Sequence, residues 1–297
     1  MSKKVSVSVP ATSANLGPGY DSLALALELR DVVTAELTND SKVTVEIIGN
    51  GAGKLPTDET HLIAKTIIET SKKLGKEISG LSLKCENAIP QGRGLGSSAA
   101  AVIAGLVLTR ELTGLEIDDD FILQEATRIE HHPDNASACL MGGLTISWET
   151  SDGQVNTRSM NVNPAVIPIV GIPDIELSTQ EARGLIPAKI DHVDAVFNSS
   201  RTALLVAALV ADTTSLLDAT DDKLHQNYRR PAYPESMNLV DQLRDQGIAA
   251  CISGAGPTVL ALATHENANQ ALSIISQVGF TATALQVADE GAFVPVN

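Results

Sequence analysis

The chain has 297 residues, of which 43% are hydrophobic and 3% aromatic, and its formal net charge is −15. This length and apolar content are typical of a globular protein of one or two domains with an aliphatic core, and they exclude a disordered chain. So acidic a surface disfavours nucleic acid and anionic membranes as partners, and an anionic ligand would have to be held locally by backbone N–H groups, a cation or a few arginines.

Cysteine usage and the apolar segments narrow the class of protein further. Cys85, Cys139 and Cys251 are far apart and form no CxxC pair, which disfavours a disulfide framework or a zinc cluster. The N-terminal residues lead directly into a strand-like alternation, and the longest apolar helical region, 203–210, is too short to cross a membrane. We therefore expect a soluble, cytoplasmic protein.

In the first half of the chain, the spacing of apolar residues predicts both strands and helices. Val5, Val7 and Val9 alternate with polar residues, which predicts a half-buried strand that stops at Pro10. Further strands are expected over residues 31–37, 42–48, 81–88 and 144–149. Helices are expected over residues 62–74, with Gly75 ending the helix, and over 98–113 and 119–130.

The second half has a different order of elements, which indicates a second domain. Strands are expected over residues 166–172, 249–253, 258–263 and 281–287, and helices over 191–211, 235–246 and 266–278. This order resembles a split βαβ arrangement with helices packed on one side of the sheet. We place the boundary near residue 160, which gives domains over residues 1–160 and 161–297.

A glycine- and serine-rich loop lies between an expected strand and an expected helix. It reads Pro90-Gln91-Gly92-Arg93-Gly94-Leu95-Gly96-Ser97-Ser98-Ala99-Ala100. Glycines let the backbone approach a ligand and adopt positive φ, and Ser97 and Ser98 are suited to cap a helix whose first N–H groups attract anions. The pattern predicts a triphosphate site, with Arg93 adding positive charge. The alternative is a serine-capped turn without a ligand.

Two other irregular segments carry polar groups that suit a binding site. Residues 253–258 (SGAGPT) form a tight turn between two apolar strands, from which Thr258 offers a hydroxyl. In residues 10–21 (PATSANLGPGYD), prolines and glycines disfavour regular structure, yet Asn15 and Asp21 stand in an apolar neighbourhood. A plain turn would not need those side chains, so binding is favoured there.

A fourth segment, residues 130–135 (EHHPDN), follows the helix expected over 119–130. A pair of histidines beside an acid is a possible metal site, but the spacing differs from the HExxH arrangement of a zinc helix. We therefore do not expect a transition metal at this position.

Together the four segments resemble the GHMP small-molecule kinase family, and within it the branch that phosphorylates L-homoserine. The matching strings are PATSANLGPGYD (10–21), IPQGRGLGSSAAA (89–101), EHHPDNA (130–136) and SGAGPT (253–258). GLGSSA is specific to the superfamily, and ANLGPGYD combined with HPDN is typical of that branch. The resemblance implies an α+β fold of two domains, the first like domain 2 of ribosomal protein S5 and the second ferredoxin-like.

The same resemblance implies the substrates and the residues that bind them. ATP and Mg²⁺ would bind at the loop 90–101, and the γ-phosphoryl group would pass to the hydroxyl of L-homoserine. Asp21, helped by Asn15, would face the substrate's ammonium and hydroxyl groups. Arg183, in the same segment as Thr179, and Arg229 would bind its carboxylate, since a planar guanidinium can hold a carboxylate bidentately.

The catalytic candidates follow from the HPDN string. His132 and Asn135 match residues near the transferred group, and Asn135 stands where other GHMP kinases carry an aspartate base. An amide cannot deprotonate an alcohol, so catalysis would depend on alignment and on charge neutralisation by Mg²⁺, Arg93 and backbone N–H groups. Arg183 and Thr258 complete the candidate set.

The sequence departs from the family pattern at two positions. The family carries a magnesium-ligating glutamate eight residues before the HPDN histidine, where this chain has Gln124 followed by Glu125. A step of one residue turns a helical side chain by about 100°, so the two positions are not equivalent. We expect Ser98 to ligate magnesium together with Gln124 or Glu125. In the nucleotide pocket, His61 stands where the family usually has asparagine.

Two alternatives stay open at this point. The chain could be a GHMP kinase for another small alcohol, although the HPDN asparagine and the two arginines disfavour this. It could also be a non-catalytic protein that binds a nucleotide or metabolite on the same fold, an alternative that Gln124 favours. A homodimer is an expectation from the family alone.

Overall fold

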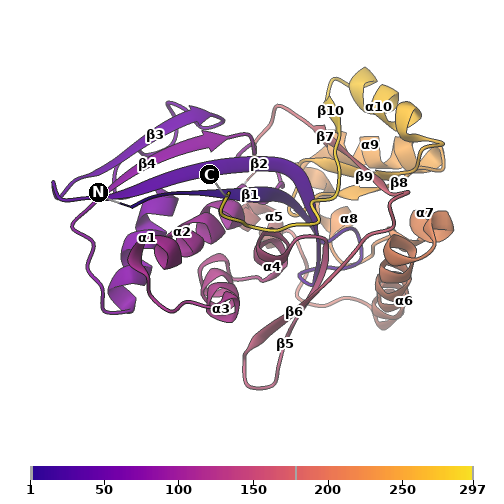
Figure 1. Cartoon of the computed structure of the whole chain (residues 1–297). Coiled ribbons are helices and arrows are strands. Elements are labelled where there is room, and N and C mark those ends of the chain that lie inside the picture. Colours follow the sequence, from indigo (N-terminus) through magenta and orange to yellow (C-terminus); the bar gives the residue numbers. More distant parts are fainter. Residues whose placement is uncertain (1–2, 178, 296–297) are drawn as a thin grey trace.

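The computed structural model describes residues 3–177 and 179–295, which form two sheets with helices packed against them (Figure 1). In chain order the strands and α-helices are β1 (Lys4–Ala14), β2 (Leu23–Thr38), β3 (Val43–Gly49), α1 (Leu62–Lys73), β4 (Gly80–Asn87), α2 (Ser97–Thr113), α3 (Asp119–Glu130), α4 (Asp134–Met141), β5 (Leu144–Glu149), β6 (Val155–Met160), β7 (Ile167–Ile172), α5 (Thr179–Gly184), α6 (His192–Val210), α7 (Leu216–Ala219), α8 (Gln226–Arg229), α9 (Pro234–Asp245), β8 (Ala249–Ile252), β9 (Val259–Ala263), α10 (Ala268–Gln277) and β10 (Thr281–Ala284).

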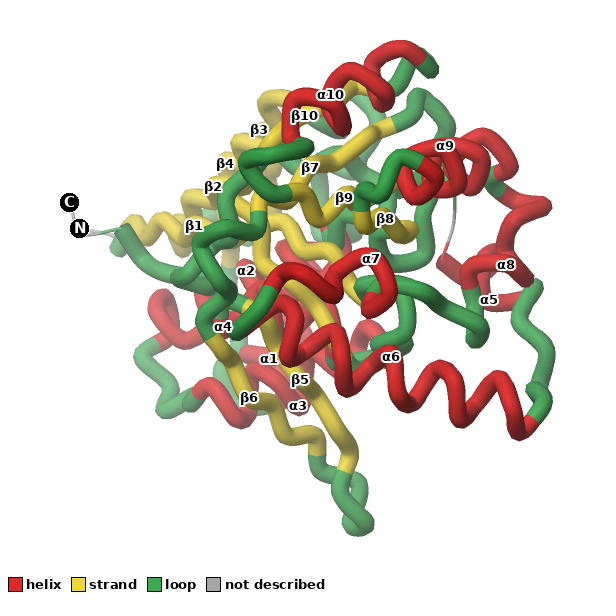
Figure 2. The backbone as a smooth tube through the Cα atoms, turned by 90° about the vertical axis from the view of Figure 1, so that its right-hand side faces the viewer, coloured by secondary structure: helices red, strands yellow, loops and turns green. Residues whose placement is uncertain are grey.

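The first sheet is built around the long strand β2. Its order is β3-β4-β2-β5-β6, and β1 pairs antiparallel with β2 along its whole length. Helices α1 to α4 lie on one face of this sheet, and the β5–β6 hairpin projects away from the body of the molecule in both views (Figures 1 and 2). This arrangement places the end of β1 and the start of α2 next to each other.

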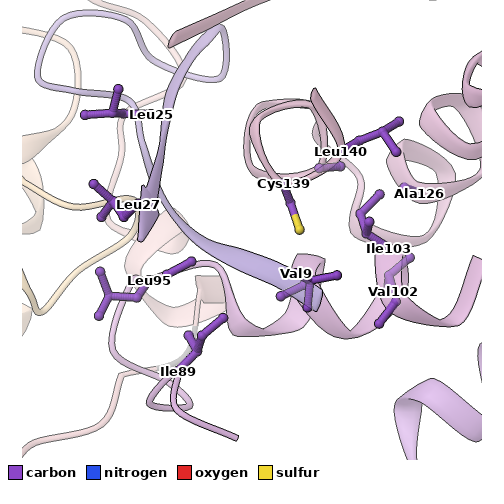
Figure 3. Packing of buried hydrophobic residues seen from close by; sticks show 14 of the residues in the cluster. Val9, Leu25, Leu27, Ile89, Leu95, Val102, Ile103, Ala126, Cys139 and Leu140 are labelled. Carbon is purple, nitrogen blue, oxygen red and sulfur yellow. The ribbon is translucent and has the colours of Figure 1, made fainter. Parts of the chain in front are cut away.

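The main core lies between the first sheet and α2. The Ala-rich helix buries Val102 and Ile103 among side chains from β1 and β2 (Figure 3). Ile89 and Leu95, at the two ends of the glycine-rich loop, are also buried in this cluster. Burying two large aliphatic side chains stabilises the fold by roughly 3–6 kcal/mol, so the loop is held firmly at both ends.

The second sheet is fully antiparallel, with the order β10-β7-β9-β8. When the four strands are numbered 1 to 4 along the chain, their order across the sheet is 4-1-3-2, which is the arrangement of a ferredoxin-like domain. Helices α9 and α10 pack against this sheet. After β10 the chain returns to the first sheet, where Ser8 N donates to Phe293 O at 2.8 Å and Glu28 N donates to Gln286 O at 2.9 Å. The first sheet ends with β6 at Met160 and the second begins with β7 at Ile167, while the end of the chain joins the two parts. The domain boundary near residue 160 stays a prediction.

The structure corrects several sequence expectations. The first strand does not stop at Pro10: β1 continues to Ala14, because a bulge between Pro10 and Ala11 accommodates the residue that cannot donate a ladder hydrogen bond. The strand β6 was not among the strands expected from the sequence. Its residues are mostly exposed at the sheet edge, so they carry no apolar alternation.

The prediction that no helix reaches the length of a membrane span was also wrong. Among the described residues, α6 has 19 residues and a mean hydropathy of 1.4, enough by length and composition alone, although the core helices of soluble proteins pass the same test. The apolar region predicted from the sequence, 203–210, covers only the C-terminal part of α6. The N-terminal part adds Val193 and Val196, which are exposed.

Candidate active site

A cleft of about 210 Å³ opens where the two sheets meet. It is lined by backbone and side chains from six segments, namely the end of β1, the glycine-rich loop with the start of α2, the α3–α4 junction, α5, α8 and the loop between β8 and β9. The residues that line it are Ala14, Asn15, Gly92, Gly94, Gly96, Ser97, Ser98, Ala99, Glu130, His132, Asp134, Asn135, Leu177, Arg183, Arg229, Gly254, Ala255 and Gly256. All four motifs found in the sequence therefore contribute to one site.

The glycine-rich loop is held by close backbone packing that only glycine permits. Gly94 has φ +77°, and a Cβ there would lie 2.3 Å from Ser253 O. Gly96 has φ +70°, and a Cβ there would lie 1.9 Å from Thr12 Oγ1. Ser253 Oγ donates to Gly94 O at 2.6 Å, so the loop between β8 and β9 is bound directly to the glycine-rich loop.

The start of α2 presents unpaired N–H groups to the cleft. Gly96 is the N-cap residue and there is no side-chain cap, so the expectation that Ser97 and Ser98 would cap the helix was wrong. Both serines lie in the first turn instead. The first intrahelical bond runs from Ala100 N to Gly96 O at 2.9 Å, and the preceding N–H groups are available to an anion at the positive end of the helix dipole.

A second, mainly apolar cavity of about 380 Å³ adjoins the first and shares Gly92, Ser97 and Ser98 with it. His61, Gln91 and Ala100 line it as well. The ring of His61 is buried and its Nδ1 has no hydrogen-bond partner, and burial lowers the pKa of this imidazole. A mostly apolar pocket beside a helix N-terminus suits an aromatic ring such as a nucleotide base.

Not every residue of the glycine-rich loop faces these cavities. Leu95 is 1% exposed and belongs to the hydrophobic core, and Pro90 lines neither cavity. Arg93 also lies outside both linings. Its Nη2 is 3.9 Å from Glu176, and its Nη1 is buried without a hydrogen-bond partner.

Asp21 and Arg183 form a bidentate ion pair at the cleft. Arg183 Nη2 donates to Asp21 Oδ1 at 2.5 Å and Arg183 Nη1 donates to Asp21 Oδ2 at 3.0 Å. Arg183 Nη1 also donates to the Tyr20 hydroxyl at 2.9 Å. The acid expected to bind an ammonium and the base expected to bind a carboxylate are thus adjacent, and each neutralises the other.

Asn15 holds this arrangement in place. Its Nδ2 donates to Gly254 O at 2.8 Å, and its Oδ1 accepts the backbone N–H of Asp21 at 3.0 Å. Both ends of the side-chain amide are therefore engaged. Asn15 orients Asp21 and joins the loop 15–21 to the β8–β9 loop.

Arg229 is a buried cation with neutral neighbours. The residue is 1% exposed. Its guanidinium donates to Ala182 O at 3.2 Å and to His225 Nδ1 at 3.2 Å, and it lies 5.5 Å from the ring centre of Tyr20. Among the described residues, no Asp or Glu forms an ion pair with it. A buried charge without a partner is costly, so this position is suited to an anionic ligand.

His132 and Asn135 lie together at the start of α4. His132 Nδ1 is 2.8 Å from Asp134 Oδ1, and Thr12 Oγ1 donates to Asn135 Oδ1 at 2.7 Å. Burial alone would lower the pKa of His132, but the hydrogen bond and the charge of Asp134 outweigh it and raise that pKa. The amide of Asn135 cannot act as a base, and Nδ1 of His132 is engaged by the Asp134 carboxylate.

The side chains expected to complete a metal site lie elsewhere. Gln124 Nε2 donates to Val155 O at 2.7 Å, and Gln124 Oε1 accepts from Val155 N at 3.0 Å, so Gln124 fastens α3 to β6. Glu125 is buried in ion pairs with Lys73 and Arg128. Neither residue is among those that line the cleft.

Glu130, the last residue of α3, lies beside Ser98, where Gln124 or Glu125 was expected. Ser98 Oγ donates to Glu130 Oε1 at 2.7 Å, and both residues line the cleft. Glu130 is part of the EHHPDN string but is not among the magnesium ligands expected from the sequence. Its position directly before the histidines was the available signal.

Of the remaining expected residues, one does not line the cleft and the other is described only in its backbone. Thr258 is fully buried, does not line the cleft, and its Oγ1 has no hydrogen-bond partner. Its backbone N–H donates to Arg93 O at 3.2 Å, so it supports the glycine-rich loop from behind. Thr179 begins α5, and its side chain lies outside the part of the chain that the structure describes.

Two family models match the chain. The model for the N-terminal domain of GHMP kinases matches residues 61–143, and the model for the C-terminal domain of GHMP kinases matches residues 205–280. The first match contains the glycine-rich loop and α4, and the second contains α8 and the β8–β9 loop. The two matches thus include both sides of the cleft.

Curated relatives match over nearly the whole chain. Homoserine kinase of Streptomyces avermitilis is 47% identical over 295 residues, which cover 98% of this chain and 95% of that protein. Homoserine kinase of Clavibacter michiganensis is 43% identical, with 98% of this chain and 96% of that protein covered.

Solved structures agree with these relatives. The crystal structure of homoserine kinase from Cytophaga hutchinsonii matches with a TM-score of 0.87 at 27% identity, covering 99% of this chain and 98% of that one. Lactococcus lactis galactokinase complexed with galactose matches with a TM-score of 0.69 at 17% identity, covering 98% of this chain and 95% of that one, which shows a shared fold alone.

Proposed function

This chain belongs to the homoserine kinases of the GHMP kinase family, and from that membership we propose how its cleft binds ATP and L-homoserine. The enzyme transfers the γ-phosphoryl group of ATP to the side-chain hydroxyl of L-homoserine and forms O-phospho-L-homoserine, a step of threonine biosynthesis.

The observation that carries the proposal is the charge arrangement opposite the start of α2. L-homoserine is a zwitterion whose ammonium needs an anion and whose carboxylate needs a cation. Arg183, which lines the cleft, is paired with Asp21, and the buried Arg229 has no acidic ion-pair partner among the described residues. We assign the ammonium to Asp21 and the carboxylate to Arg183 and Arg229, so that each charge of the zwitterion meets a charge of opposite sign.

ATP fits the other side of the cleft. The free N–H groups at the start of α2 and the backbone of Gly92, Gly94 and Gly96 would bind the triphosphate. The adjoining apolar cavity with His61 would take the base. Because the two cavities share Ser97 and Ser98, a nucleotide spanning both would direct its γ-phosphate toward the homoserine side.

The residues present fit a magnesium ion. Ser98 and Glu130 offer a hydroxyl and a carboxylate 2.7 Å apart in the cleft, and Mg²⁺ binds hard oxygen donors, commonly one or two carboxylates together with phosphate oxygens. No group of three His, Cys, Asp or Glu side chains gathers elsewhere in residues 3–177 and 179–295. When bound, the ion would neutralise negative charge on the phosphates.

The transfer proceeds without a strong side-chain base. The amide of Asn135 is fixed by the Thr12 hydroxyl and by the backbone and carboxylate around Asp134, which keeps it in one orientation at the cleft. Phosphoryl transfer through a loose transition state depends mainly on alignment and on stabilisation of charge, and alignment can contribute roughly 7–11 kcal/mol. We assign that alignment to His132, Asn135 and the arginines.

Release of ADP tests the proposed substrate. Purified protein with MgATP should release ADP well above background with L-homoserine, while mevalonate and galactose should give rates near background. The expected reason is that neither alcohol carries an ammonium for Asp21. Equal rates with all three alcohols, or no release with L-homoserine, would overturn the assignment.

A further inference from the structure

His225 is a fully buried histidine that does not line the cleft but contacts a residue that does. Its Nδ1 is 3.2 Å from Arg229 Nη1, and its Nε2 is 2.8 Å from Gly17 O. Gly17 belongs to the loop 15–21, which carries Asn15 and Asp21. The imidazole therefore lies between the proposed carboxylate-binding arginine and the loop proposed to bind the ammonium group.

Only one form of the imidazole satisfies both contacts. A guanidinium can only donate hydrogen bonds, so His225 Nδ1 must accept and carry no proton. A carbonyl oxygen can only accept, so Nε2 must carry the proton that points to Gly17 O. His225 is thus fixed as the neutral tautomer protonated at Nε2, and a doubly protonated ring would place a second N–H donor against Arg229.

The surroundings stabilise that neutral ring. Burial lowers the pKa of His225, and the charge of Arg229 acts in the same direction. The charges of Asp222 and Asp21 raise the pKa, but Asp222 already accepts the backbone N–H groups of Leu224, His225 and Gln226. The Tyr20 ring packs against the imidazole with ring centres 5.1 Å apart.

We propose that His225 is a positioning residue for the reaction, a proposal that rests on the proposed function. As a neutral hydrogen-bond acceptor, His225 orients Arg229 toward the substrate carboxylate. It also ties that arginine to the loop 15–21. Among the described residues, Arg229 also donates to two backbone carbonyls, Ala182 O and Gly254 O, and the buried Tyr233 side chain interacts with it as well. Without the acceptor at His225 Nδ1, the Nη1 end of the guanidinium would keep the long contact of 3.5 Å to Gly254 O, so binding would cost more of the entropy of ordering that end.

Two isosteric variants separate the two hydrogen bonds of His225. In His225→Asn the side-chain oxygen takes the place of Nδ1 and can still accept from Arg229, whereas the donor to Gly17 O is lost. In His225→Gln the amide nitrogen takes the place of Nε2 and can still donate to Gly17 O, whereas the acceptor for Arg229 is lost.

His225→Gln should raise the KM for L-homoserine at least about tenfold, as expected when a hydrogen bond to a charged group is lost. His225→Asn should stay within about threefold of the unmodified enzyme, and the KM for ATP should change little in both.

A ligand lacking the carboxylate distinguishes positioning from general damage to the fold. 3-Aminopropan-1-ol is homoserine without its carboxylate, and its inhibition constant against L-homoserine can be measured for each variant. If His225 acts through Arg229, His225→Gln should weaken binding of L-homoserine but leave binding of 3-aminopropan-1-ol unchanged within about twofold, with thermal unfolding recorded as the control for folding.

Equal losses for the two ligands, or an Asn variant as impaired as the Gln variant, would overturn the positioning role. Such results would leave the proposed function intact, because that function is judged on the unmodified enzyme alone. Failure of the unmodified enzyme to phosphorylate L-homoserine would instead overturn the proposed function.

Discussion

At the scale of single residues, the most informative feature is that Arg229, one of the two arginines that line the cleft, has no acidic ion-pair partner among the described residues. Arg183 is held by Asp21, but Arg229 is buried among neutral groups. An uncompensated buried guanidinium costs free energy in the folded protein, and the bound carboxylate offsets that cost. Substrate affinity and the placement of this arginine are therefore linked.

Replacing Arg229 with lysine tests this link. The variant keeps the charge but loses the planar fork, so the KM for L-homoserine should rise at least about tenfold while the KM for ATP stays within about twofold. Arg230→Lys is the matched control, because Arg230 lies next in sequence and forms an exposed ion pair with Asp241. Steady-state kinetics of both variants provide the comparison, and similar KM values for the two would contradict the assignment of Arg229.

A pair of glutamate variants tests the magnesium assignment. Glu130→Gln should raise the Mg²⁺ concentration needed for half-maximal activity about tenfold or more, since a carboxylate ligand next to Ser98 is lost. Glu125→Gln should leave that concentration nearly unchanged and lower the melting temperature, because Glu125 is buried between Lys73 and Arg128. Activity titrated with Mg²⁺ at saturating ATP separates the two, and the opposite order would restore the sequence-based hypothesis.

At the scale of elements, the glycine-rich loop works through its contacts with β1 and with the β8–β9 loop. The sequence predicted a backbone that approaches a ligand. The structure adds that the same glycines approach the protein itself, since Gly94 lies against Ser253 O and Gly96 against Thr12 Oγ1. The shape of the phosphate site therefore depends on strands from both halves of the chain.

Two alanine substitutions in this loop should differ in their effect on stability. Gly96→Ala combines a positive φ with a clash against Thr12 Oγ1 and should cost at least about 2 kcal/mol of unfolding free energy, with a raised KM for ATP. Gly92→Ala also has a positive φ, but the nearest atom to its Cβ is 3.5 Å away, so only backbone strain of about 1 kcal/mol is expected. Urea unfolding of the two variants measures the difference, and equal costs would contradict the packing argument.

Elements with strong apolar periodicity could be predicted from the sequence, and those governed by tertiary contacts could not. The helix patterns of α1, α2 and α3 gave nearly the correct bounds, because their apolar faces pack on the sheet. The edge strand β6 was missed, since its exposed polar residues carry no such pattern.

The predicted magnesium ligands also show that features governed by tertiary contacts could not be predicted from the sequence. Gln124 and Glu130 are six residues apart on α3 and differ by about 120° around the helix axis. Counting back from the histidine therefore selects residues that do not line the cleft. Which face meets Ser98 depends on how α3 packs against α2 and β6, and no local pattern specifies that.

At the scale of the whole molecule, the two halves are joined beyond the chain connection near residue 160. The loop between β8 and β9 bonds to the glycine-rich loop, and residues after β10 pair with β1 and β2. Asp31 holds the residues that lead into the glycine-rich loop. Its Oδ1 accepts hydrogen bonds from Ala88 N at 2.7 Å and from Ile89 N at 2.8 Å.

Asp31 makes a specific pH dependence of stability expected. Burial raises the pKa of this carboxyl from 3.8 to about 6, although the two backbone hydrogen bonds oppose the rise. Between these values the folded state binds more protons than the unfolded state, so this group's contribution to stability falls as pH rises from about 4 to 6, by up to about 3 kcal/mol. Asp31→Asn keeps an oxygen for both N–H groups and does not titrate. The difference in unfolding free energy between Asp31→Asn and the unmodified protein should therefore grow in favour of the variant across that range, and a difference independent of pH would contradict the burial argument.

The central claim is that one cleft recognises the ammonium, the carboxylate and the hydroxyl of L-homoserine and phosphorylates the last of these. The most direct test compares kcat/KM for L-homoserine with the values for 4-hydroxybutanoate, which lacks the ammonium, and 3-aminopropan-1-ol, which lacks the carboxylate. A site built from Asp21, Arg183 and Arg229 should reject each analogue by at least about 100-fold, because each analogue lacks one of the two charged groups that the site recognises. Values of kcat/KM within about tenfold of that for L-homoserine would contradict the account.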